Sequence, residues 1–372
     1  MRINQQRLIR EFISLVSIDS PSFGERRMGD VLKDRLYSLG FAVSEDEAGA
    51  RIGGDCGNIH GFLPGMLDAE PLLFCAHMDT VEPSKGKQAV IGEDGVIRSS
   101  GDTVLGADDC AGIAAVLEAL RAIREQEIPH RPIEVLFTVA EEPYCKGIEQ
   151  FDFSRIRAKE AYVLDLAGPV GAAAYQAPTI LSFTVAIRGR SAHAGFAPQN
   201  GIHAIAAAAD AIGKLRMGRI DDETTLNIGV IEGGLAANIV PDRCIVKGEI
   251  RSYSHEKALS GAELVKKQFE DAARAVGASA DFSNRVGCEA YRTPPEHPVV
   301  KRFERACEKQ GLSAVLQKTF GGSDQNRLAK HGITGIVIAN AMNACHSREE
   351  YTTIDELCRI AGLTLSLMSA AD

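Results

Sequence analysis

The sequence of 372 residues lacks three features that would each point to a broad class of proteins. It has no apolar run of the ~18–20 residues that a membrane-spanning helix needs. It has no excess of positive charge, because 41 Lys and Arg residues stand against 50 Asp and Glu, for a formal net charge of −9. Since phosphate contacts need a basic surface, we expect no nucleic-acid partner, and the lack of a polybasic patch disfavours a membrane surface.

The cysteines also lack the pattern of a disulfide framework. The nine cysteines are scattered and odd in number, and no CxxC pair occurs. This predicts reduced thiols in a cytoplasmic protein. The N-terminus does not resemble a signal peptide, because residues 4–16 place Leu8, Phe12 and Val16 on one face of an amphipathic helix with charged residues between them.

Helical periodicity alternates with short apolar runs in the first part of the chain and again near its end. The stretch Cys110–Arg124 has the spacing of a helix. This alternation predicts an α/β layer with a largely parallel sheet. The runs predicted as buried strands are Leu72–Ala76, Ile133–Ala140, Tyr162–Leu164 and Ile333–Ala339.

A different pattern lies between these two parts. Its predicted strands and helices follow the order β-α-β-β-α-β, which is the split βαβ arrangement. We therefore predict an inserted α+β domain of residues 178–289 within a discontinuous domain of residues 1–177 and 290–372. The segments of the insertion are Ile180–Arg188, Gly201–Leu215, Thr225–Ile231, Arg243–Arg251, Lys257–Val276 and Ala278–Cys288.

Side chains that bind metals follow the predicted strands of the first domain, and a carboxylate pair, Asp108 and Asp109, opens its helix. Each feature alone has an ordinary explanation, such as a helix cap, a core histidine or a solvated strand end. Because the carboxyl ends of parallel strands share one edge, we expect these groups to meet there. Crowded carboxylates repel one another unless a cation neutralises them. The groups after the strands are His77, Glu141 with Glu142, Asp165 and His346.

The composition of this set favours particular metals. Two histidines and several carboxylates without a cysteine suit zinc, cobalt or manganese. One carboxylate can bridge two ions. The neighbours Glu141 and Glu142 point in different directions, so one can bind metal while the other takes a proton from a water that attacks a carbonyl.

These residues resemble the motifs of the M20 family of di-zinc metallopeptidases, in particular its peptidase T-like branch. The resemblance covers nearly the whole chain. It implies a zinc-peptidase-like catalytic domain, with the insertion as a lid and dimerisation domain. It suggests a homodimer and leaves a monomer open. The motifs are His77-x-Asp79-Thr80, Gly106-Ala107-Asp108-Asp109-x-Ala111-Gly112, Glu141-Glu142, Asp165 and His346.

The resemblance also implies a role for each residue of the metal centre. His77 would bind the first of two divalent ions and Asp165 would be a further ligand, while Asp108 would bridge both ions. Glu142 and His346 would complete the shell of the second ion. The peptide bond after Asp108 is commonly cis in the family.

The remaining roles concern catalysis and substrate. Asp79 would orient His77, and Glu141 would be the general base. His193, in the segment Gly189–Gly195, would stabilise the oxyanion, typically from the partner subunit. Asn238 and Arg251 match positions that grip substrate in relatives.

Several alternatives stay open at this stage. The resemblance predicts an aminopeptidase for short peptides, similar to a tripeptidase. An amidohydrolase that removes an acyl group from an amino acid would use the same metal centre, and a metal-free binding protein would share the scaffold. The residues Pro143, Tyr144 and Cys145 depart from the family pattern and put the substrate in doubt. A dehydrogenase is disfavoured because no GxGxxG follows the first strand.

Overall fold

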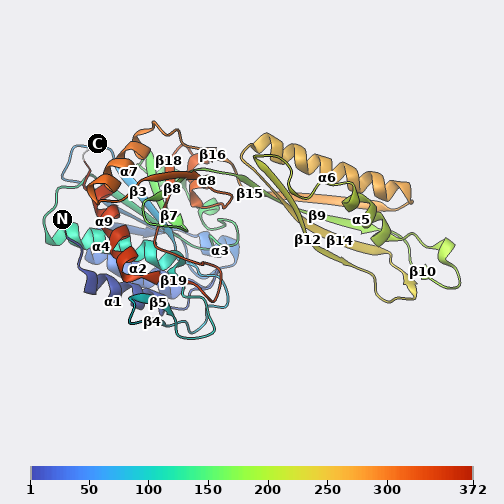
Figure 1. Ribbon diagram of the computed structural model, residues 1–372, viewed down its shortest axis with the longest axis horizontal. Coiled ribbons are helices and arrows are strands. Elements are labelled where there is room, and N and C mark those ends of the chain that lie inside the picture. The colour runs from blue at the N-terminus through green and yellow to red at the C-terminus, as the bar shows by residue number, and fades with distance from the viewer. Residues whose placement is uncertain (1, 371–372) are drawn as a thin grey trace. The chain divides into compact units, whose positions relative to one another are not determined.

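The computed structural model describes residues 2–370, which form two compact units (Figure 1). Unit 1 comprises the described residues up to Gln176, together with Arg292–Thr319 and the residues from Ser323 onwards. Unit 2 comprises Ala177–Tyr291 and the short segment Phe320–Gly322. Residues 1, 371 and 372, at the ends of the first predicted domain, lie outside the described residues.

Unit 1 contains a large sheet with the strand order β1-β2-β6-β3-β7-β18-β8-β16, and β17 pairs with β8. Its strands are β1 (Ala42–Glu45), β2 (Ile59–Leu63), β3 (Leu72–His77), β6 (Ile133–Thr138), β7 (Glu160–Leu166), β8 (Ala172–Ala177), β16 (Tyr291–Arg292), β17 (Val315–Lys318) and β18 (Thr334–Ala339). The central strands β6, β3, β7 and β18 run parallel, which confirms the predicted α/β class. Strands β1 and β2 extend the sheet antiparallel, and β8 joins β18 antiparallel.

Helices cover both faces of this sheet (Figure 1). They are α1 (Gln5–Val16), α2 (Arg26–Ser38), α3 (Ala48–Ile52), α4 (Ala107–Glu125), α7 (Pro298–Lys309), α8 (Asp324–Lys330) and α9 (Ile354–Met368). Helices α1, α4 and α9 pack against one another. A small separate sheet has the order β19-β5-β4, from β19 (Tyr351–Thr353), β5 (Val96–Ser99) and β4 (Ala89–Ile91).

The sequence of β3 explains its central place. All its residues are buried, as expected for a parallel strand that is covered on both faces. Because side chains alternate along a strand, Leu72 and Phe74 enter the core beneath α1, α4 and α9, while Cys75 points to the other face. There the Cys75 thiol donates to Asp324 at the start of α8, with 3.7 Å between Sγ and Oδ2.

The structure corrects two predicted strand ends. Asp165 was expected just beyond its strand but lies inside β7, because the pairing with β18 resumes after an irregularity in β7, where Leu166 pairs with Ala339. The strand predicted to end at Ala140 ends at Thr138, where its pairing with His77 stops. Ala140 has a φ of 47°, which no strand residue adopts.

Unit 2 is an antiparallel sheet with two helices, and its order of elements is the predicted split βαβ (Figure 1). The sheet order is β11-β12-β14-β9-β15. The elements are β9 (Thr179–Arg188), α5 (Ala204–Gly213), β11 (Gly218–Arg219), β12 (Thr224–Gly233), β14 (Arg243–Ser252), α6 (His255–Ala275) and β15 (Ser279–Cys288). Helices α5 and α6 pack side by side over a core of aliphatic and aromatic residues. A short separate pair joins β10 (Ala192–His193) and β13 (Ile239–Val240).

Candidate metal centre

Three neighbouring strands bring predicted site residues to one edge of the sheet in unit 1. His77 is the last residue of β3, Asp165 lies near the end of β7, and Glu141 follows three residues after β6. These strands are parallel, so their carboxyl ends share the edge at which ligands bind in open α/β sheets. Ligand atoms of all three side chains lie within 4.8 Å of one another.

Asp108 reaches the same edge from the start of α4. Gly106 precedes the helix with a φ of 80°, and the peptide bond from Asp108 to Asp109 is cis, as the resemblance predicted. The two carboxylate oxygens of Asp108 face different histidines. Oδ1 lies 2.9 Å from His77 Nε2, and Oδ2 lies 3.1 Å from His346 Nε2. This is the arrangement that a carboxylate bridging two ions requires.

His346 and Glu142 form the other side of the centre. His346 lies in the loop after β18, and its Nε2 is 3.1 Å from Glu142 Oε2. The second oxygen, Oε1 of Glu142, is buried and has no hydrogen-bond partner among the described residues. A buried carboxylate oxygen without a partner is costly, and a divalent cation would satisfy it. The donor set of two imidazoles and several carboxylates therefore fits such an ion.

Asp79 contacts His77 more closely through its backbone than through its side chain. The ring of His77 donates from Nδ1 to the Asp79 carbonyl oxygen at 2.9 Å, whereas the Asp79 carboxylate lies 3.6 Å away. With its proton on Nδ1, the neutral ring leaves the Nε2 lone pair for a metal. The Asp79 carboxylate instead accepts the backbone N–H groups of Glu141 and Glu142 and the hydroxyl of Ser22.

Burial and crowding change the proton affinities in the centre. Burial raises the pKa of Glu141 well above its usual value, and the nearby Asp165 adds to the effect. Burial likewise raises the pKa of Asp165. Burial also opposes the charge on Asp108, but hydrogen bonds with His346 and His77 outweigh it and lower the pKa. The hydrogen bonds that the His346 ring donates to the carboxylates of Asp108 and Glu142 raise the pKa of His346 to about 10. Protonation thus reduces the repulsion among these carboxylates, and a bound cation would reduce that repulsion instead.

Sequence reasoning missed residues that support Asp108 from distant parts of the chain. Both carboxylate oxygens of the buried Glu350 accept backbone N–H groups, from Gly106 at 2.7 Å and from Asp108 at 3.0 Å. Asn340 donates to Asp109 at 2.6 Å. Glu350 follows His346 by four positions, but no local pattern links it to Asp108, which lies 242 residues earlier in the chain.

The predicted residues of unit 2 make contacts within that unit. His193 is exposed in β10, and its Nδ1 accepts the N–H groups of Gly195 and Phe196 at 3.1 and 3.2 Å. The neutral ring therefore carries its proton on Nε2 and can donate from there. The backbone of Asn238 lies beside it, accepting the N–H of Ala194 at 2.9 Å. The Arg251 guanidinium pairs with the Glu249 carboxylate through two hydrogen bonds of 2.7 and 3.1 Å.

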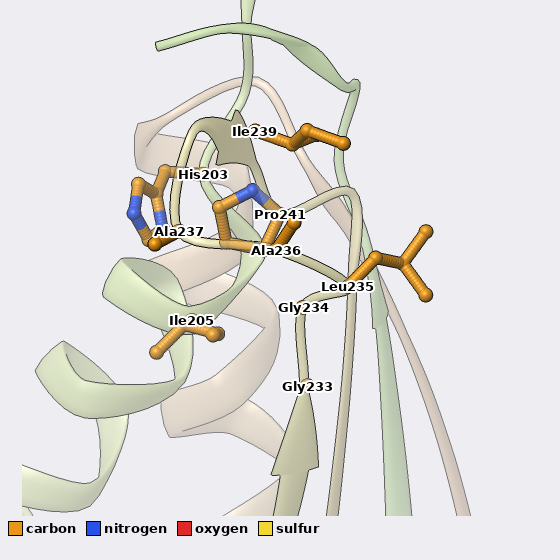
Figure 2. A pocket seen from close by; sticks show the side chains of 9 residues that line it. All are labelled: His203, Ile205, Gly233, Gly234, Leu235, Ala236, Ala237, Ile239 and Pro241. Carbon is orange, nitrogen blue, oxygen red and sulfur yellow. The ribbon is translucent and has the colours of Figure 1, made fainter.

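A cavity of about 370 Å³ lies next to Asn238 within unit 2. Figure 2 shows that the turn Gly233–Ala237 and the start of α5, with His203 and Ile205, line it. The exposed Leu235 side chain points away from the turn. No carboxylate occurs among the lining residues, so this pocket does not share the chemistry of unit 1.

Two family models match the chain. Residues 58–174 match the model described as peptidase family M28, and residues 176–277 match the one described as a peptidase dimerisation domain, M20_dimer. Among curated proteins, the uncharacterized protein YqjE of Bacillus subtilis (strain 168) is 38% identical, and the match covers 99% of each chain.

Two crystal structures are similar over almost the full length of the chain. Aminopeptidase PepT from Bacillus cereus ATCC 10987 is 40% identical with a TM-score of 0.93, covering 99% of this chain and 98% of that one. A tripeptidase from Staphylococcus aureus is 33% identical with a TM-score of 0.97, covering 100% and 99%. The chain belongs to the peptidase T-like branch of the M20 peptidases. This M20 protein is therefore a peptidase.

Within residues 2–370 of this M20 peptidase, no helix combines the length and the apolar character needed to cross a bilayer. All nine cysteines lie in the described residues, and none forms a disulfide.

Proposed function

We propose that the protein is a metal-dependent aminopeptidase that hydrolyses an amide bond of short peptides, with tripeptides as the preferred substrates. The observation that carries this proposal is the position of Asp108, whose two oxygens each face a different histidine at 2.9 and 3.1 Å. The similarity to an aminopeptidase and to a tripeptidase supports the substrate class.

Two divalent cations would share this centre. His77 and Asp165 would bind the first, Glu142 and His346 the second, and Asp108 both. Zinc is the preferred ion on the donor chemistry, with cobalt or manganese as alternatives. When bound, such ions polarise a scissile carbonyl and lower the pKa of a water molecule.

The residues of the chain would then move the proton. Glu141 would accept the proton of the attacking water and pass it to the leaving amine. Its carboxylate suits this role because it is buried beside His77 and Asp165. Asp79 would fix the position of Glu141 by accepting its backbone N–H at 2.9 Å.

Residues 178–289 would act as a lid and dimerisation domain around the catalytic domain of residues 1–177 and 290–372. The match to the peptidase dimerisation model over residues 176–277 supports a homodimer. His193 would donate from Nε2 to the oxyanion of the tetrahedral intermediate. Asn238 and Arg251 would grip the substrate, and Arg251 would exchange its bond with Glu249 for a peptide carboxylate.

The first experiment combines a metal count with a substrate screen. The protein is purified without chelator, its zinc, cobalt and manganese are counted per chain, and dipeptides, tripeptides and N-acyl amino acids are assayed. We expect about two ions per chain and cleavage of tripeptides with a free amine. Cleavage of N-acyl amino acids alone would show a deacylase. A protein that neither carries metal nor gains activity when metal is added would be a binding protein instead.

A further inference from the structure

A third group of potential metal ligands lies next to the proposed centre. Ligand atoms of Glu141, Cys145 and Asp324 lie within 4.8 Å of one another, and all three residues are buried. The Cys145 thiol donates to Glu141 Oε1, with 3.3 Å between Sγ and oxygen. Glu141 thus belongs both to the group with His77 and Asp165 and to this third group, which we call the thiol cluster.

The turn after Glu142 directs the thiol toward Glu141. Tyr144 and Cys145 have φ values of 71° and 52°, in the left-handed region that residues with a side chain seldom adopt. The Cys145 N–H donates to the Glu141 carbonyl oxygen at 2.6 Å, which closes the turn. The backbone therefore holds the thiol against the carboxylate.

Asp324 provides a second, independent observation in favour of a ligand at this cluster. Its side chain is 1% exposed. Oδ2 accepts the hydroxyl of Thr138 at 2.6 Å and the thiol of Cys75 at 3.7 Å. Oδ1 is buried and has no hydrogen-bond partner among the described residues. Leaving a buried carboxylate oxygen unsatisfied is costly, and a cation in the thiol cluster would remove that cost.

The donor types of the cluster differ from those of the proposed two-metal centre. One sulfur and two carboxylates suit a borderline or soft divalent ion such as zinc or cadmium, whereas magnesium and calcium prefer oxygen alone. The spacing of 3.3 Å between sulfur and oxygen is close to what two ligands on one tetrahedral ion show.

We infer that Glu141, Cys145 and Asp324 form an accessory site for zinc or cadmium. On binding, the Cys145 thiol releases its proton to solvent and its sulfur bonds the ion. The ion then occupies the Glu141 carboxylate, which can no longer accept a proton from water. Excess zinc or cadmium therefore inhibits the peptidase. Binding itself is independent of catalysis, but the inhibition rests on the role proposed above for Glu141.

The test is a titration of the metal-loaded protein with cadmium ions, followed by ultraviolet absorption and by peptide cleavage. The proposed two-metal centre contains no thiol, so a thiolate-to-cadmium charge-transfer band reports an ion bound at a cysteine, and loss of the band in Cys145→Ser would assign it to the thiol cluster. Cys145→Ser keeps the size and the hydrogen bond to Glu141 but removes the sulfur. Cys244→Ala is the matched control, because Cys244 is a buried thiol in the core of unit 2.

In the wild type and in Cys244→Ala we expect the band to saturate with one further cadmium ion, while cleavage falls in parallel. Cys145→Ser should lose the band and need at least about tenfold more cadmium for half inhibition, since even partners of a ligand change metal affinity 10–100-fold. Asp324→Asn should keep the band but shift its midpoint to higher cadmium.

Two results would overturn the inference. One is the absence of a cadmium-dependent band in an active wild-type protein, and the other is an unchanged band in Cys145→Ser. A wild-type protein that shows the band but cleaves no peptide would instead contradict the proposed function and leave the accessory site standing.

Discussion

The predicted site residues of unit 1 are buried or half-buried, apart from the exposed His346, and they contact one another. In unit 2, by contrast, His193 and Asn238 are exposed. His77 and Asp108 are 2% and 5% exposed and contact residues from distant parts of the chain. The His193 ring accepts hydrogen bonds from the backbone of its own turn, and Phe196, whose ring lies beside it, is 86% exposed. The core of unit 1 therefore positions His77 and Asp108, while substitution of the exposed His193 should change catalysis without changing stability.

The largest effect should come from Glu141→Gln. Because the amide cannot accept a proton, turnover should fall about 10²–10⁴-fold, the range that general base catalysis supplies. Metal content, counted by elemental analysis, should stay at the wild-type value. Glu93→Gln, in an exposed loop of unit 1, serves as the control. Full activity of Glu141→Gln would show that another group is the base.

The next-largest effect should come from the exposed His193 of unit 2. In His193→Ala, kcat should fall about 10²–10³-fold, as when an oxyanion donor is lost. The free energy of unfolding in urea should change by less than about 0.5 kcal/mol, as for other exposed residues.

The control for that variant is His203→Ala in the same unit. The His203 ring also accepts a backbone N–H through Nδ1, from Ala206 at 3.2 Å, and so caps α5. Its loss should cost about 1 kcal/mol of stability with little change in kcat. Equal loss of stability in both variants would remove the proposed difference between the two histidines.

A smaller effect should follow from Glu350→Gln in unit 1. The amide keeps one acceptor for the N–H groups of Gly106 and Asp108 but turns its NH₂ group toward the other. Metal affinity, measured by competition with a chelator, should fall about 10–100-fold. The exposed neighbour Glu349→Gln is the control. If both variants kept wild-type affinity, the positioning role of Glu350 would be wrong.

The smallest effect on catalysis should come from a substitution away from the site, which changes stability instead. Burial raises the pKa of Glu45, but hydrogen bonds from Arg26 and Lys33 outweigh it and lower the pKa to about 2. A carboxylate with a lowered pKa stabilises the fold above its unfolded pKa, and this stabilisation is lost as the pH falls toward 2. Glu45→Gln should therefore lose about 1–3 kcal/mol at pH 7. The difference from wild type should shrink between pH 4 and pH 2, and kcat should not change.

The parts of the fold that sequence could predict are those with strong local patterns. The continuous apolar run of β3 and the alternating pattern of β9 each predict a strand. Strand β8 reads Ala-Ala-Ala-Tyr-Gln-Ala and has no β-branched residue, so only its pairing with β17 and β18 makes it a strand. Strand β1 pairs only with β2, at the end of the sheet order, and its short sequence gave no signal.

The same reasoning separates the site residues that sequence could find from those it could not. His77 and Glu141 follow apolar runs, so local sequence places them at the sheet edge. Glu350 contacts Asp108 across 242 residues, and Asp324 reaches Thr138 across 186. No local pattern encodes such pairs, because they depend on how α8 and the last loop pack against the sheet.

The position of β18 in the sheet of unit 1 has a consequence for biosynthesis. This strand lies between β7 and β8, yet it is translated after the whole of unit 2. The nascent chain therefore carries a sheet without its central strand while unit 2 is being made, and the edges of β7 and β8 stay open to other chains. His346 comes later still, so a ribosome that stalls early releases a polypeptide that cannot complete the centre around Asp108.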